Sequence, residues 1–204
     1  MTAFFSAQSE KSISPFSSCK LPIEPCPPAV AEIGYMLIAL GGLPGTGKTT
    51  IARELARQLG AVHLRIDSIE QALRDYGVAG RSMDDAGYRA AYAIAADNLC
   101  TGQTVIADSV NPLPVTRDAW VAVAQRTGAR VVEVEVICSD PDEHRRRAEM
   151  RISDIPGLQL PTWEEIVSRE YHPWDREHIV VDTALRDVEQ NVKMLREALA
   201  AQRG

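Results

Sequence analysis

The chain has 204 residues, of which 45% are apolar and 25% charged, the balance of an ordinary folded protein. This length allows one domain with a substantial core and is short for two. The net charge of −6 gives no overall positive field, which disfavours a protein that reads DNA sequence but leaves room for an enzyme acting on the end of a nucleic acid.

The four cysteines are scattered along the chain, and no two have the C-x-x-C spacing of a zinc or thiol-redox site. Free thiols in a reducing compartment are therefore expected. The longest apolar run, residues 35–40, is too short to cross a bilayer, and the N-terminus lacks the basic and apolar segments of a signal peptide. These features predict a cytoplasmic protein with no membrane partner.

Residues 1–33 differ from the rest because they are rich in Ser and Pro and show neither helix nor strand periodicity. We interpret them as a flexible N-terminal extension, with a docking tail as the alternative. From residue 34 to residue 204 the pattern alternates between strand and helix, which indicates one domain.

The elements of that domain can be taken in chain order. We predict a strand at 35–42, a helix ending at Gly60, a strand at 61–67, helices at 68–76 and 84–101, a strand at 104–110, a helix at 113–127, a strand at 130–138, helices at 140–151 and 162–171, a strand at 178–183 and a final helix.

The apolar patterns place these strands within a sheet. The first strand is continuously apolar, as expected of a strand covered on both faces, whereas 61–67 alternates like an edge strand. Glu133 and Glu135 do not fit a covered strand at 130–138. The final helix is expected to pack on the sheet through one stripe. That stripe comprises Leu185, Val188, Val192, Leu195 and Leu199.

Strands that alternate with helices predict an α/β fold, with a parallel sheet and right-handed crossovers. Ligands of such folds bind at the carboxyl ends of the strands. The polar positions that follow the first three strands begin at Gly42, Asp67 and Asp108, so we expect them to gather at one edge of the sheet.

The segment "GLPGTGKTT" matches G-x-x-x-x-G-K-[ST] between a strand and a helix, the pattern of a phosphate-binding loop. Its glycines allow a tight turn with inward N–H groups, the lysine supplies a charge to the β- and γ-phosphates, and the first threonine supplies a hydroxyl to Mg²⁺. A bound nucleotide and Mg²⁺ are therefore expected. The predicted nucleotide-binding residues are Gly42, Leu43, Pro44, Gly45, Thr46, Gly47, Lys48, Thr49 and Thr50.

Other residues indicate how the nucleotide is used. The chain has no N-K-x-D motif for guanine, which disfavours a GTP switch, and Asp108 stands alone where a motor ATPase usually has an acidic pair. Asp108 is a candidate magnesium ligand, through a bound water, or a cap before "NPLP". Asp67 is a candidate base that receives the proton of an acceptor hydroxyl. The alternative is that Asp67 caps the next helix, in a capping box with Glu70.

In "HRRRAEMR", His144, Arg147 and Arg151 share one helix face. We predict that this segment belongs to a lid at about 140–172, in which Arg147 and Arg151 neutralise the transferred phosphoryl group. A surface pair of Arg147 with Glu143 is the alternative.

Three further residues are weaker candidates for acceptor contacts. Arg74 lies two helical turns after Asp67, and Asn111 and Arg117 follow the third strand. Arg74 could equally well be an exposed side chain on a helix, and Asn111 before Pro112 is common in turns.

The phosphate loop, the Asp after the second strand, the Arg-bearing segment and "IVVDTA" together resemble the small P-loop kinases over about residues 35–200. This group includes gluconate kinase, adenylylsulfate kinase, chloramphenicol phosphotransferase, zeta-type toxins and polynucleotide kinases. The resemblance implies a five-stranded sheet in the order 2-3-1-4-5, transfer of phosphate from ATP to a hydroxyl, and a loop near Thr183 beside the nucleotide base. The "DGDN" motif of the adenylylsulfate enzymes is absent, which disfavours that member.

The sequence thus predicts an ATP-dependent kinase that phosphorylates a hydroxyl of a small molecule or of a nucleic-acid end. Two alternatives stay open. One is an ATP-binding regulatory module that transfers nothing, and the other is a zeta-toxin-like kinase of an amino-sugar nucleotide.

Overall fold

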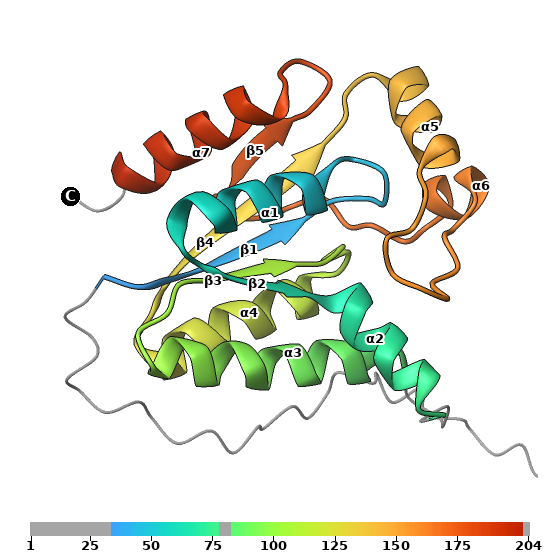
Figure 1. Ribbon diagram of the computed structural model, residues 1–204. Coiled ribbons are helices and arrows are strands. Elements are labelled where there is room, and N and C mark those ends of the chain that lie inside the picture. Colours follow the sequence, from blue (N-terminus) through green and yellow to red (C-terminus); the bar gives the residue numbers. More distant parts are fainter. Residues whose placement is uncertain (1–33, 78–82, 202–204) are drawn as a thin grey trace, which may run out of the picture.

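The computed structural model describes residues 34–77 and 83–201 (Figure 1). The predicted extension, 1–33, lies outside them. The described residues form a parallel five-stranded sheet in the order β2-β3-β1-β4-β5. Both the α/β fold class and the strand order implied by the resemblance are confirmed. The strands are β1 (Met36–Gly41), β2 (Val62–Arg65), β3 (Val105–Asp108), β4 (Arg130–Ile137) and β5 (Ile179–Asp182).

Helices cover both faces of this sheet, so the domain is a three-layer sandwich (Figure 1). One face packs on α1 and α7, and the other on α3 and α4. The short helices α5 and α6 lie beyond the carboxyl end of the sheet, near the start of α1. The helices are α1 (Lys48–Leu59), α2 (Ile66–Asp75), α3 (Met83–Cys100), α4 (Pro114–Thr127), α5 (Pro141–Met150), α6 (Trp163–Val167) and α7 (Val188–Ala201).

The strands follow their apolar patterns, and β2 lies at an edge as predicted. The glutamates of β4 are explained by the segment before β5. Tyr171 donates a hydrogen bond from its hydroxyl to Glu135 Oε1 (2.8 Å), and Arg176 lies 4.0 Å from Glu133 Oε2. Burial raises the pKa of Glu133, against the opposing charge of Arg176. Polar side chains from 171–178 therefore cover this side of β4.

Several sequence predictions need correction at element ends. Helix α6 is five residues long rather than spanning 162–171, because the chain leaves it at Ser168. Helix α7 begins at Val188, so Leu185 and Val188 are exposed and only the later residues of the predicted stripe are buried.

Cys138 has a free thiol as expected, whereas Cys100 is disulfide-bonded. No helix within the described residues combines the length and apolarity needed to traverse a bilayer.

Candidate functional site

The phosphate loop joins β1 to α1 and is shaped by its glycines. Gly42 has φ of 130°, and a Cβ added there would lie 2.1 Å from the carbonyl oxygen of Val136 in β4. Only glycine fits at this position. Gly45 and Gly47 also have positive φ angles, and α1 begins at Lys48, immediately after the loop. The first N–H groups of α1 thus face the loop, as in an anion-binding helix start.

Lys48 is the buried cation of this loop. Its Nζ donates a hydrogen bond to the carbonyl oxygen of Leu43 (2.7 Å). Burial lowers its pKa to about 8, although the charges of Asp108 and Asp67 raise it. The ammonium group is therefore poorly solvated, which favours an anionic ligand that would restore its charge compensation.

Asp108 ends β3 and is only 4% exposed. Its Oδ2 lies 3.1 Å from Nε2 of His63 on the neighbouring strand β2. Burial acts to raise the pKa of Asp108, but the hydrogen bond with His63 and the charge of Lys48 outweigh it, so the pKa is lowered. Thr49 adds a smaller effect in the same direction. Asp108 is thus an ionised carboxylate beside the phosphate loop.

Asp67 lies in the first turn of α2 rather than at the end of β2, since the helix begins at Ile66. The N-cap of α2 is Arg65, and no side chain caps the helix. The predicted capping box of Asp67 with Glu70 is therefore wrong, and the carboxylate has no capping role. Its side chain is 50% exposed, and Oδ2 lies 3.8 Å from Nη2 of Arg65.

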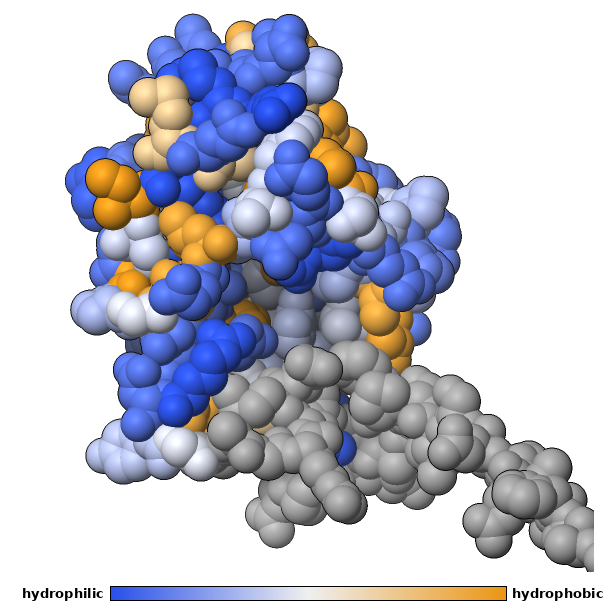
Figure 2. Space-filling model, turned by 90° about the vertical axis from the view of Figure 1, so that its right-hand side faces the viewer, coloured by the Kyte–Doolittle hydropathy of each residue, from blue (hydrophilic) through white to orange (hydrophobic). Residues whose placement is uncertain are grey.

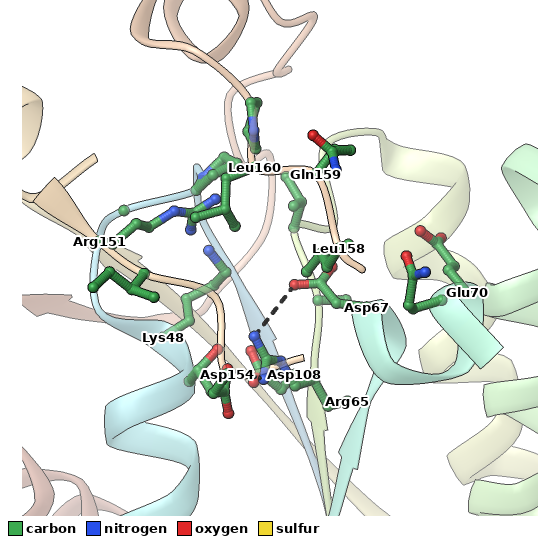
Figure 3. Close-up of a pocket in the computed structure, with 18 of the residues that line it drawn as sticks. Lys48, Arg65, Asp67, Glu70, Asp108, Arg151, Asp154, Leu158, Gln159 and Leu160 are labelled. Atoms are coloured by element: carbon green, nitrogen blue, oxygen red, sulfur yellow. Dashed lines mark hydrogen bonds and ion pairs between the residues drawn. The ribbon is translucent and has the colours of Figure 1, made fainter. Parts of the chain in front are cut away.

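A cavity of about 910 Å³ connects these residues at the carboxyl end of the sheet (Figure 3). In Figure 3 the charged ends of Lys48, Asp67 and Arg151 point into the same space, while Glu70 points away from Lys48. The predicted site residues that line the cavity are Pro44, Gly45, Gly47, Lys48, Thr49, Thr50, Asp67, Arg74, Asp108, Arg147 and Arg151.

Helix α5 rests directly on the phosphate loop. His144 is buried, with Nε2 2.9 Å from the carbonyl oxygen of Pro44, and a Cβ at Gly45 would lie 3.2 Å from Ala148 Cβ. Arg147, one turn after His144, donates from Nη1 to Thr183 Oγ1 (2.9 Å). The arginine-bearing helix and the loop after β5 are thus joined next to the phosphate loop.

Thr183 itself donates a hydrogen bond from Oγ1 to the carbonyl oxygen of Thr46 (2.8 Å). It therefore lies against the phosphate loop but does not line the cavity. Arg147 also donates to Glu143 Oε1 (2.6 Å), so the predicted ion pair of Arg147 with Glu143 is present alongside its contact with Thr183.

Arg151 stands just beyond the end of α5, at its C-cap. Burial lowers its pKa, against the opposite charge of Asp67. Its Nε is buried without a hydrogen-bond partner in the described residues. The side chain lines the cavity and makes no hydrogen bond within the described residues, so its Nη groups can donate to a ligand there.

Asn111 and Arg117 do not reach the cavity, which corrects their assignment as acceptor contacts. Both are fully buried. Asn111 donates from Nδ2 to the carbonyl oxygen of Leu40 (2.8 Å) and accepts from Trp120 Nε1 (3.1 Å). Arg117 donates to four backbone carbonyls and stacks 4.3 Å from the ring of Trp174. Their side chains hold α4 and the 171–174 segment together.

Sequence reasoning missed several residues that line the cavity. Arg65 was available to it, because the alternation in β2 places Arg65 and His63 on one face. Asp154 lacked any such signal, because only the tertiary path of the 152–161 loop brings it to the cavity. Gln71 lies on α2 one turn after Asp67, and this i+4 spacing could have indicated it. The missed residues with charged or amide side chains are Arg53, Arg65, Glu70, Gln71, Asp154, Gln159 and Arg169.

The face that carries α5 and α6 is polar over most of its visible surface, with apolar groups in small separate patches (Figure 2). Met150 and Ile152, both exposed, contribute apolar surface at the cavity edge. A hollow bordered mainly by polar groups suits a charged, hydrated ligand better than an apolar one.

Comparison with known proteins adds to this geometry. Residues 37–156 match the model of the AAA domain family. No curated protein matches the chain. Among solved structures, the APS kinase CysC of Mycobacterium tuberculosis, in complex with AMPPNP and APS, is 20% identical with a TM-score of 0.64, over 81% of this chain and 98% of that one.

Two further structures resemble the chain. Kti12 of Chaetomium thermophilum, in complex with ADP-AlF3, is 26% identical with a TM-score of 0.58, over 80% of this chain and 98% of that one. A gluconokinase of Sinorhizobium meliloti is 15% identical with a TM-score of 0.55, over 84% and 99%. At these identities the two kinases support the fold. The phosphate loop, the strand order and the family match agree, and the chain therefore belongs to the AAA domain family, with the fold of the small P-loop kinases.

Proposed function

We propose that this protein is an ATP-dependent kinase that transfers the γ-phosphate to a hydroxyl group. The observation that carries this proposal is that Lys48 and Asp67, from different elements, line one cavity of about 910 Å³. Phosphoryl transfer to an alcohol needs a cation on the phosphates and a group that orients the hydroxyl, at opposite ends of one space. Binding of nucleotide alone does not require the second group.

The nucleotide end is assigned to the phosphate loop. Backbone N–H groups of residues 45–50 and the ammonium of Lys48 would hold the phosphates of ATP. Thr183, beside the loop, would lie near the base. The hydroxyl of Thr49 and the ionised carboxylate of Asp108 both line the cavity and are oxygen donors that suit Mg²⁺. When bound, Mg²⁺ would offset charge on the phosphates.

The acceptor end is assigned to Asp67 and the lid arginines. Asp67 would orient the hydroxyl and receive its proton as the oxygen attacks the γ-phosphorus. Arg151 would donate hydrogen bonds to the phosphoryl oxygens, where negative charge concentrates during transfer. Arg147, tied to Thr183, would sit between nucleotide and lid. Residues 140–172, which carry both arginines, would form the lid that excludes water.

The acceptor is a hydroxyl compound that fits beneath the 152–161 loop. That loop reaches α2, since a Cβ at Gly157 would lie 3.0 Å from Nε2 of Gln71. This closure favours a small molecule over the end of a polymer, which would need an opening in the lid. Arg74, on the cavity wall, is retained as a candidate acceptor contact. A cytoplasmic location, with its supply of ATP, fits this activity.

The substitution Asp67→Asn tests the proposal. It keeps the size of the side chain and removes the base, so transfer should fall by roughly 10²–10⁴-fold. ADP affinity, measured by calorimetry, should change by less than about twofold, because the proposal assigns Asp67 to the acceptor and not to the nucleotide. Asp97→Asn, which alters an exposed carboxylate on α3, is the matched control and should leave both unchanged. Undiminished transfer in Asp67→Asn would remove Asp67 from this role.

The acceptor is found by giving the protein γ-labelled ATP with pools of sugars, nucleosides, antibiotics, other alcohols and RNA with a free hydroxyl end. Label on one pool identifies the class. Label that reaches only water, together with a partner that binds in one nucleotide state, would instead establish the regulatory module. Growth arrest on expression that disappears with Lys48→Ala, with label on an amino-sugar nucleotide, would establish the toxin-like kinase.

A further inference from the structure

Arg65, the last residue of β2, lies between two carboxylates (Figure 3). Its Nη1 donates to Asp154 Oδ1 at 2.8 Å, and its Nη2 lies 3.8 Å from Asp67 Oδ2. Its side chain is 13% exposed, and its Nε is buried with no hydrogen-bond partner among the described residues. The two carboxylates are therefore the groups that orient this guanidinium.

Asp154 comes from a different part of the chain, the loop between α5 and α6. It accepts hydrogen bonds from Arg65 and from Arg53 of α1. These two hydrogen bonds hold the pKa of Asp154 well below its usual range, so the carboxylate stays ionised across the physiological pH range. The loop is thereby tied to β2 and to α1 at a point on the cavity wall.

We propose that Arg65 is a positioning residue that couples docking of the 152–161 loop to the orientation of Asp67. This inference rests on the proposed role of Asp67 as the base. With Asp154 docked, one side of the guanidinium is fixed and the other side faces Asp67. Without Asp154, the guanidinium can turn fully toward Asp67 and draw its carboxylate out of line with the acceptor. The base is then ready only when the loop covers the cavity.

The physical reason is the planar shape of the guanidinium. Its two Nη groups are held in a rigid fork, so fixing one of them fixes the direction of the other. A misplacement of about 1 Å at a reacting group can cost on the order of 10²-fold in rate. Coupling the base to the loop would suppress phosphate transfer to water in the open state, because water reaches the cavity before the loop closes.

Arg53 provides a matched control, because it binds the same carboxylate of Asp154 and makes no contact with Asp67 among the described residues. If Asp154 acts only by anchoring the 152–161 loop, the loss of either arginine should lower kcat by a similar factor. If Asp154 acts through Arg65, the loss of Arg65 should lower kcat more than the loss of Arg53. The substitutions Arg65→Met and Arg53→Met remove each guanidinium while keeping most of the stem.

The experiment measures turnover of γ-labelled ATP, with the hydroxyl pool that accepts label and with water alone, and ADP affinity by calorimetry. Arg65→Met and Asp154→Asn should each lower kcat with the pool by about 10- to 100-fold. The double variant Arg65→Met/Asp154→Asn should have a kcat no lower than that of either single variant. Arg53→Met should lower kcat by less than about threefold, and ADP affinity should stay within about twofold in all of these variants. Equal losses in Arg53→Met and Arg65→Met would overturn the coupling.

Two more variants keep the test decisive. In an Asp67→Asn background, Arg65→Met should have no further effect, and an additional loss there would contradict action through Asp67. Arg65→Lys covers the case in which Arg65→Met does not fold. The donors of an ammonium rotate freely, so it cannot fix one contact through the other as the planar fork does, and full activity of Arg65→Lys would also reject the coupling. Unimpaired Asp67→Asn would refute the proposed function itself, whereas an inactive Asp67→Asn with a normal Arg65→Met would refute only this inference.

Discussion

Two arginines that the sequence placed in the same candidate site have opposite surroundings in the structure. Arg117 is fully buried, and its donors are used by the backbone carbonyls of Asn111, Pro112, His172 and Pro173. Arg151 borders the cavity, and its Nε is buried without a partner in the part of the chain that the structure describes. The first guanidinium holds segments of the fold together, and the second has donors left for a ligand.

The contrast between Arg117 and Arg151 shows that residue type and position along the chain do not decide the role of an arginine. What decides it is whether the fold itself supplies acceptors. Carbonyls of two irregular segments supply them to Arg117, with Trp174 stacked against its plane. Among residues 34–77 and 83–201, no such carbonyls accept hydrogen bonds from Arg151, so its donors can be paired by a bound ligand.

The largest expected effect is on catalysis. Arg151→Met should lower phosphate transfer by roughly 10²–10³-fold, the cost of losing one donor to the charge that develops during transfer. Stability should change by less than about 0.5 kcal/mol, because Arg151 makes no ion pair within the described residues. Steady-state kinetics and denaturant unfolding measure the two. A marked loss of stability with unchanged transfer would mean that Arg151, like Arg117, stabilises the fold and does not act on the phosphoryl group.

Arg117→Met should show the opposite pattern. It leaves four carbonyls without their donor and removes the stacking on Trp174, so the free energy of unfolding should fall by about 3 kcal/mol. Transfer by the folded fraction should stay within about threefold of the unaltered protein. Urea unfolding and kinetics at low temperature measure these. A stable Arg117→Met protein without activity would support the original assignment of Arg117 as an acceptor contact.

The pH dependence of nucleotide binding tests the charge of the cavity. Burial lowers the pKa of Lys48 to about 8 in the nucleotide-free protein, and phosphates bind its ammonium form. As the pH rises above this value the ammonium is lost before binding, so ADP affinity should be about tenfold weaker at pH 9 than at pH 7. Lys48→Arg keeps its charge and should flatten this profile. An equally steep profile in Lys48→Arg would assign the titration to another group.

The smallest expected effect is a loss of stability at Tyr171, which contacts Arg117 and Trp174. The hydroxyl of Tyr171 donates to Glu135 and accepts from Trp174 Nε1, each at 2.8 Å. Tyr171→Phe removes one hydrogen bond from each partner, while His178 still lies 3.4 Å from Glu135 Oε2, and should lower the free energy of unfolding by about 1 kcal/mol, with no change in transfer. Thermal unfolding and kinetics check this. A loss of transfer without a loss of stability would mean that Tyr171 also shapes the cavity.

The parts of the molecule that sequence predicted well are those set by local chemistry. The phosphate loop follows from glycine positions within nine residues, and the layered fold follows from apolar periodicity. Asp67 lines the cavity, although the strand before it was drawn two residues too long. Asn111 and Arg117 were misassigned because their partners, in β1 and in 172–173, are distant in sequence. Asp154 was missed because a loop aspartate carries no periodic signal.

The close approach of Gly42 to β4 changes how mutational scans of this loop should be understood. An added methyl group would collide with the carbonyl of Val136, whatever occupies the nucleotide end. A variant at this position that no longer binds ATP would thus report a steric conflict between the phosphate loop and β4 rather than a lost phosphate contact. Evidence for phosphate recognition must come from positions such as Thr49, where the side chain can be exchanged without disturbing the sheet.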